Sequence, residues 1–254
     1  MDRKEAKPEP APLGCLDLDF DFEKNEAQMC EPANYEAIYY TPHKGPSRVG
    51  TFSNDGQLIA TGSVDQSIKI LDVDRMLARS NISETNFDNE RGESSSHPVI
   101  RTLYDHTDEV TALAFHPKEH LLLSGSRDKT LKLFDFSKPN VKRSKEHVQE
   151  CSEINALTFH PTGEYFLCGT NHHIIRLYHL QTFQSFVCSM PMDYHRGPIT
   201  CINYSFDGKL YVTSSLDGDI RVWDSISNRC VQHFVGAHDQ QEVTSARFSR
   251  NGKV

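Results

Sequence analysis

An internal repeat constrains this chain more than any other feature. Four eleven-residue segments align when the sequence is laid against itself, beginning at Gly62, Gly125, Gly169 and Ser214. Each contains two acids or two histidines seven residues apart: Asp65 and Asp72, Asp128 and Asp135, His172 and His179, Asp217 and Asp224. Self-similarity with a period of some tens of residues is the signature of a repeat architecture. The chain is therefore expected to fold as a series of similar units.

Each unit carries the pattern of short β-strands. A histidine stands 22 residues before the first acid in three repeats, namely His43, His106 and His195. Between the histidine and the acid lie two runs of β-forming residues joined by a turn, as in 110–115 and 121–124. Turns containing Pro or Asp-Gly supply the backbone angles that reverse a strand. Short strands at regular spacing predict an all-β fold.

The chain resembles the WD-repeat family from about residue 35 to residue 254. Trp223-Asp224 matches the Trp-Asp pair of that family, and Leu71-Asp72 and Phe134-Asp135 are softened versions. The resemblance implies a β-propeller in which a histidine, the turn acid and a strand hydroxyl form a buried network. The network residues are then His43 with Asp65, His106 with Asp128, and His195 with Asp217 and Trp223. Only the fourth repeat offers a Trp N–H donor to complete the network.

The third repeat departs from this pattern. His172 occupies the position of the turn acid, and Glu150 occupies the position of the upstream histidine. No matched polar pair is therefore expected there. We predict that this unit is held together by its apolar strands alone.

The last residues begin a fifth repeat. Gly236-Ala237-His238 and the run 243–248 repeat the start of a unit, and the sequence stops where its second strand is due. Propellers close into rings of about 4–8 blades. The expectation is an incomplete ring of four blades plus the first strand of a fifth, belonging to something longer.

Two segments stand outside the repeats. Residues 1–34 are rich in proline and acids and are expected to be disordered. Within them, residues 16–22 alternate apolar and acidic side chains, which is typical of an extra half-buried strand or of a short acidic-hydrophobic motif for a partner. Residues 74–98 form a long insertion rich in Ser, Asn and Glu, which is also predicted to be disordered.

The sequence offers little for chemistry. It contains no C-x-x-C, H-E-x-x-H or G-x-S-x-G pattern and no glycine-rich phosphate loop, so we expect no enzyme activity, metal or cofactor. Seven scattered cysteines indicate free thiols. No apolar run reaches the roughly 18 residues of a membrane helix, so no membrane contact is expected. A net charge of −8 argues against the whole chain clamping nucleic acid.

Two groups of residues are candidates for partner binding. In WD-repeat propellers the residue before each turn acid opens onto one rim, and here these residues are Val64, Arg127, Asn171 and Leu216. Arg127 is the charged member, and it is either a binding hot spot, where arginine is enriched, or a side chain whose stem only covers neighbouring apolar surface. The second group is a basic run at 138–145, which includes Lys142 and Arg143. This run is either a solvated loop or a contact for RNA or an acidic partner.

Longer strings extend the resemblance beyond the repeat consensus. They resemble the WD-repeat subunits of cleavage stimulation factor and lie at 43–46, 55–63, 67–72, 97–106, 124–128, 130–135, 227–230 and 237–239. The resemblance implies a non-catalytic scaffold in the nucleus that assembles with the other cleavage stimulation factor subunits and the 3′-end processing machinery. No segment resembles that family's helical dimerisation domain, so the resemblance does not carry homodimerisation over to this chain. The alternatives are another WD-repeat adaptor, in splicing or ubiquitin-ligase assembly, or direct RNA binding through the basic run.

Overall fold

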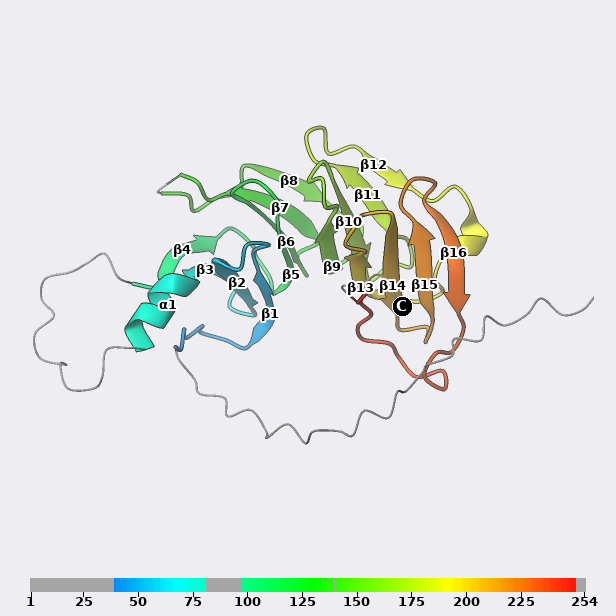
Figure 1. Cartoon of the computed structure of the whole chain (residues 1–254), viewed down its shortest axis with the longest axis horizontal. Helices are drawn as coiled ribbons and strands as arrows, with labels where there is room; N and C mark the ends of the chain where they lie inside the picture. The colour runs from blue at the N-terminus through cyan, green and yellow to red at the C-terminus, as the bar shows by residue number, and fades with distance from the viewer. Residues whose placement is uncertain (1–38, 81–96, 139, 250–254) are drawn as a thin grey trace, which may run out of the picture. The chain divides into compact units, whose positions relative to one another are not determined.

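The computed structural model describes residues 39–80, 97–138 and 140–249. These residues form four antiparallel sheets of four strands each, with one sheet per repeat (Figure 1). The predicted all-β, four-bladed architecture is confirmed. The segments expected to be disordered at 1–34, and the possible strand at 16–22, lie outside the described residues.

The strands follow one another in chain order. Blade one contains β1 (Ser47–Phe52), β2 (Leu58–Ser63), β3 (Ser67–Asp72) and β4 (Val99–Tyr104). Blade two contains β5 (Val110–Phe115), β6 (Leu121–Ser126), β7 (Thr130–Asp135) and β8 (Glu146–Gln149). Blade three contains β9 (Ile154–Phe159), β10 (Tyr165–Thr170), β11 (Arg176–His179) and β12 (Ser185–Val187). Blade four contains β13 (Ile199–Tyr204), β14 (Leu210–Ser215), β15 (Ile220–Asp224) and β16 (Arg229–Phe234).

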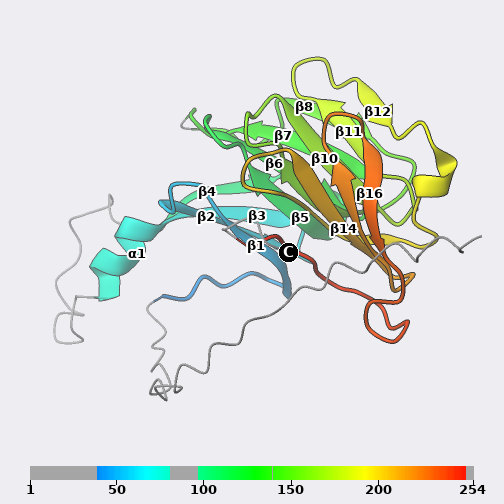
Figure 2. The same ribbon diagram turned by 45° about the vertical axis from the view of Figure 1, so that its right-hand side comes forward.

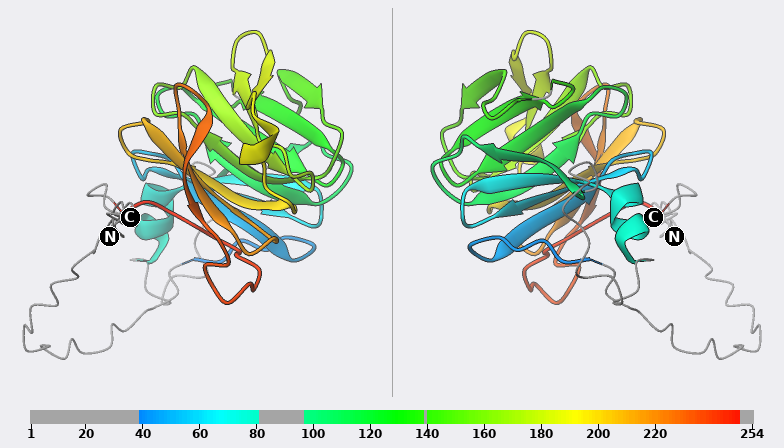
Figure 3. Two further views of the ribbon diagram at one scale, coloured as in Figure 1. Left: turned by 90° about the vertical axis from the view of Figure 1, so that its right-hand side faces the viewer. Right: turned by 90° about the vertical axis from the view of Figure 1, so that its left-hand side faces the viewer.

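Close packing between blades explains the glycine that stands three residues before the turn position in the first three repeats. A Cβ atom on Gly125 would lie 2.3 Å from the Ile154 side chain of the next blade. Gly62 meets Val110 and Gly169 meets Ile199 in the same way, at 2.6 Å. The three β-branched residues are fully buried. Blades one, two and three therefore each present a glycine to the first strand that follows, whereas blade four has Ser214 at this position. Figure 3 shows the successive sheets facing one another.

The insertion between blades one and two begins as a helix, which corrects the expectation of disorder from residue 74. The helix α1 spans Val73–Ser80 and follows β3 directly (Figure 2). The Asp72 carboxylate accepts a hydrogen bond of 3.0 Å from the Arg75 backbone N–H, as an N-cap does. The next residues, Met76-Leu77-Ala78, are strong helix formers. Residues 81–96 lie outside the described residues.

The fifth repeat contacts blade four without forming a regular strand in the described range. The Thr200 hydroxyl donates to the Val243 carbonyl at 2.5 Å, and the Asn203 amide donates to the Ala246 carbonyl at 3.0 Å. The hydroxyl of Thr111 reaches the Ile154 carbonyl in the same way between blades two and three. Residues 243–246 thus take the place of a first strand. No described strand pairs with them, and a β-ladder needs such a partner.

Candidate functional site

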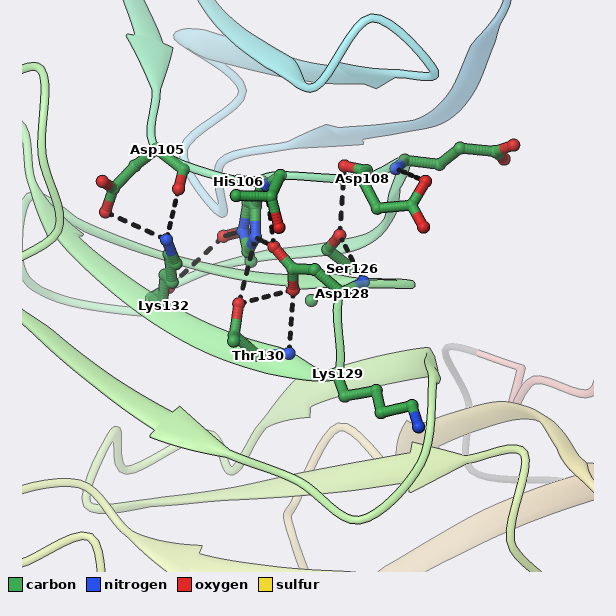
Figure 4. Close-up of polar contacts among 12 residues, drawn as sticks. Asp105, His106, Asp108, Ser126, Asp128, Lys129, Thr130 and Lys132 are labelled. Carbon is green, nitrogen blue, oxygen red and sulfur yellow. Dashed lines mark hydrogen bonds and ion pairs between the residues drawn. The ribbon is translucent and has the colours of Figure 1, made fainter.

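Blade two contains a compact polar network, drawn in Figure 4. His106 precedes β5, and Asp128 lies in the turn between β6 and β7. The His106 Nδ1 lies 2.8 Å from the Asp128 carboxylate, and its Nε2 lies 2.6 Å from the Ser124 hydroxyl. Thr130 donates to the same carboxylate from its backbone N–H at 2.9 Å and from its hydroxyl at 2.5 Å. The network therefore ties the β6–β7 turn to the segment that enters β5.

The carboxylate of Asp128 is held in its charged form. Burial alone would raise its pKa, but the hydrogen bonds from His106 and Thr130 outweigh burial and lower the pKa well below the usual range. The same bonds fix a turn in which Lys129 has a φ of 64°, a left-handed value that is uncommon for a residue with a side chain. The acid thus compensates for the backbone strain of its own turn.

Blades one and four bring the equivalent residues together, although in blade one the His43 Nδ1 is hydrogen-bonded to the Ser67 hydroxyl at 3.0 Å. In blade one the His43 Nδ1 lies 3.4 Å from the Asp65 carboxylate, and its Nε2 lies 2.9 Å from the Thr61 hydroxyl. Burial would raise the pKa of Asp65, but hydrogen bonds from Ser67 and Lys44 outweigh it and lower the pKa to about 2. The sequence-derived pair in each of these blades is therefore brought together.

In blade four the network extends to the tryptophan. The Trp223 indole N–H donates to the Thr213 hydroxyl at 2.9 Å, and that hydroxyl lies 2.7 Å from the His195 Nε2. The His195 Nδ1 lies 3.1 Å from the Asp217 carboxylate. Burial lowers the pKa of His195 to about 4, so the ring is neutral near pH 7. Nδ1 then carries the proton toward Asp217, and Nε2 accepts from Thr213.

Blade three has a polar network of a different composition, which corrects the expectation that only apolar strands hold it. Glu150 is buried and accepts a bond of 2.7 Å from the Arg176 guanidinium. It also accepts a hydrogen bond from the Tyr178 hydroxyl. Tyr178 occupies the position that Trp223 occupies in blade four. A glutamate thus replaces the histidine, and an arginine and a tyrosine replace the turn acid as its partners.

His172 takes no part in that network. Its ring stacks on His173 with the ring centroids 4.2 Å apart, and its buried Nδ1 has no hydrogen-bond partner among the described residues. Burial lowers the pKa of His172. In blade three the position of the turn acid is therefore occupied by His172, whose ring does not stabilise the turn by a hydrogen bond.

Sequence reasoning missed a lysine or arginine that recurs on the third strand of each blade. Its side chain reaches back to the segment that precedes the blade, as Lys132 does to the carbonyl and carboxylate of Asp105. Arg221 donates to the Asp193 carbonyl at 2.7 Å. The four bases are Lys69, Lys132, Arg176 and Arg221. The sequence does contain this pattern, because each of these basic residues follows the turn position of its repeat by four residues.

The rim residues are already in contact with their own chain. The exposed Arg127 side chain lies 3.4 Å from the Glu109 carboxylate and 3.8 Å from the Glu153 carboxylate. Asn171 donates to the Glu153 carboxylate at 2.9 Å. Val64 is partly buried and Leu216 is exposed. The rim of blades two and three therefore presents alternating charges whose ion pairs are long and partly solvated.

The basic run differs from the rim. Lys142 and Arg143 are exposed, and neither forms an ion pair within the described ranges. A groove of about 900 Å³ runs along the first strands and is lined by both apolar and polar residues, including Leu113, Asn155 and Thr200. No group of three or more His, Cys, Asp or Glu side chains among residues 39–80, 97–138 and 140–249 is placed to hold a metal ion. In the same ranges, no helix is long and apolar enough to cross a bilayer.

Four-stranded antiparallel blades, each with a polar network at the same position, define the class of WD-repeat proteins. The chain belongs to the WD domain, G-beta repeat family, which matches residues 38–72, 98–135, 140–179 and 186–224. It is similar to cleavage stimulation factor subunit 50 of Arabidopsis thaliana, with 37% identity over 234 residues, 91% of this chain and 52% of that protein.

Other WD-repeat proteins are similar to the chain at lower identity. COMPASS component SWD3 of Saccharomyces cerevisiae is 24% identical over 204 residues, 76% of this chain and 56% of that protein. Pre-mRNA-processing factor 19 of Bos taurus is 28% identical over 196 residues, 77% of this chain and 34% of that protein. The chain spans about half or less of the length of these relatives.

Proposed function

We propose that the chain is a non-catalytic interaction scaffold in nuclear pre-mRNA 3′-end cleavage and polyadenylation, where it binds other subunits of cleavage stimulation factor. The observation that carries this proposal is the 37% identity to cleavage stimulation factor subunit 50 over 91% of the chain. Relatives with other names match at 24–29% identity. The shared WD repeats alone account for sequence identity at this lower level. The additional identity favours a common function.

The buried networks support a structural role for their histidines and acids. The His106 and His195 side chains are fully shielded from solvent, and the Asp128 side chain is 6% exposed. A substrate would have no access to these groups. A buried polar network that is fully hydrogen-bonded makes a fold rigid and specific. The networks thereby hold the blades rigid, and partner binding is left to the exposed loops and rims.

The rim around Arg127 is the proposed docking surface for these subunits. Arg127 is held by Glu109 and Glu153 at 3.4 Å and 3.8 Å, and exposed ion pairs of this kind are worth only about 0–1 kcal/mol. A partner carboxylate can therefore take over the guanidinium at little cost. Asn171 beside it offers an amide for further hydrogen bonds.

Co-expression with the other cleavage stimulation factor subunits of the same organism tests the proposal. The tagged chain is expected to co-purify with them as a defined assembly on size-exclusion chromatography. Arg127→Glu should reduce the recovered partner at least several-fold, whereas Lys209→Glu, a charge reversal on the exposed β13–β14 turn, should not. If wild-type chain captures none of these subunits, the chain is an adaptor for another assembly. If Arg127→Glu captures them at wild-type level, the rim is not the docking surface.

A further inference from the structure

The basic loop between β7 and β8 is fixed to the blade by three contacts. Val141 packs against the hydrophobic cluster that contains Phe134. The backbone N–H and the hydroxyl of Ser144 donate to the Asp105 carboxylate at 3.1 Å and 2.6 Å. The Lys145 N–H donates to the Leu133 carbonyl at 2.7 Å. Residues 142 and 143 form the tip between these anchors and are held out toward solvent.

The positive charges at this tip have no carboxylate partner among the described residues, whereas most of the described arginines have one. Six arginines lie within 4.0 Å of a carboxylate: Arg48, Arg75, Arg127, Arg176, Arg221 and Arg229. Lys142 and Arg143 have no such partner among the described residues. Two adjacent cations on a loop held in place, without an internal counter-ion, form a preorganised anion contact.

An exposed aromatic side chain lies beside the anchor of the loop. Tyr104 ends β4 and is 61% exposed, and it immediately precedes Asp105, the residue that holds Ser144. Leu103 points into the core and is fully buried, so the Tyr104 ring projects from the opposite face of the strand. Tyr104 is thus joined to the loop through Asp105 and Ser144, the neighbour of Arg143. Exposed rings and cations together bind single-stranded nucleic acid, because bases stack on the ring while phosphates meet the charges.

We propose that Lys142, Arg143 and Tyr104 form a contact site for single-stranded RNA. The site goes beyond the proposed scaffold role and does not depend on it. Asp105 binds Ser144 beside the tip, and Glu146 follows Lys142 by four residues, so negative charge lies near both ends of the tip. The site therefore accommodates about two phosphates, one for each cation, rather than a long stretch of backbone. An acidic peptide would use the two cations but would gain little from an exposed ring.

Fluorescence anisotropy of a labelled twelve-nucleotide oligouridine with the full chain tests this site. Two neutralised phosphates predict a slope of about −1.4 for log affinity against log salt, from about −0.7 per phosphate on a single strand. Lys142→Glu/Arg143→Glu should weaken binding about tenfold or more at low salt and flatten the slope. Tyr104→Ala should weaken it about fivefold or more, and Tyr104→Phe should bind like wild type.

The matched control is Lys129→Glu/Arg196→Glu, which makes the same change in net charge on two exposed residues elsewhere. It should retain RNA binding within about twofold, since the local contact is untouched. Lys142→Ser/Arg143→Ser serves as a milder variant, with folding of each variant checked by its melting curve. The proposal is overturned if the control loses as much affinity as the tip variants. It is also overturned if oligouridine does not bind at low salt, or if a labelled hexaglutamate peptide binds through Lys142 and Arg143 while oligouridine does not.

Discussion

Replacing Asp128 with alanine tests the role of the buried network most sharply. The carboxylate accepts four hydrogen bonds, from the His106 ring, the Thr107 N–H, and the N–H and hydroxyl of Thr130. Water can replace the bond to the exposed Thr107, and the Thr130 hydroxyl lies 3.2 Å from the His106 Nδ1 and can turn to it. One or two donors then remain buried without a partner, each at a cost of about 1–3 kcal/mol.

The expected loss for Asp128→Ala is therefore about 3 kcal/mol, which corresponds to a fall of roughly 6–12 °C in Tm for a chain of this size. The matched control is Asp108→Ala, because Asp108 is exposed and its carboxylate accepts only the Glu109 N–H. Its expected change is within about 0.5 kcal/mol. Urea denaturation and thermal melting of both variants give the comparison. Equal losses for the two variants would refute the structural assignment of Asp128.

Three further outcomes follow from the other blades. Glu150→Ala should lower the free energy of unfolding by about 3 kcal/mol, because Arg176 and Tyr178 lose their buried partner; unchanged urea stability would contradict the blade-three network. His172→Ala should change stability by no more than about 0.5 kcal/mol, and a loss above about 2 kcal/mol would show that its ring supports the turn. Between pH 6.5 and 4 the unfolded chain binds a proton that buried His195, with a pKa of about 4, does not. Stability should therefore fall as the pH is lowered through this window, and His195→Gln should have a shallower pH dependence; an identical slope would place the titration elsewhere.

The repeat geometry could be predicted because it depends on spacing. A histidine and an acid 22 residues apart meet in three blades, as in His106 and Asp128, since the intervening strands have the same length each time. The glycine before the turn in the first three repeats also meets a local physical requirement, because the next blade leaves no room for a Cβ atom. Features fixed by the length and register of the strands are therefore readable from one sequence.

The corrected features depend on which side chains meet across strands, which spacing does not reveal. Glu150 stands where the other blades have a histidine, and its partner Arg176 stands four residues after the turn position, so a search for the histidine–acid pair did not reveal their pairing. The helix α1 was missed for a different reason. Asp72 ends a strand by its repeat position and caps a helix at the same time, and the polar composition of residues 81–96 masked the short helix-forming run before them.

The central claim, a scaffold role in 3′-end processing, is tested most directly by in vitro cleavage of a polyadenylation-signal pre-mRNA in nuclear extract. Extract is depleted with an antibody against the chain, and cleavage is measured with and without the purified wild-type assembly obtained by co-expression. The account predicts that depletion strongly reduces cleavage and removes other cleavage stimulation factor subunits with the chain, and that the wild-type assembly restores activity. Full cleavage in extract that contains none of the chain would contradict it.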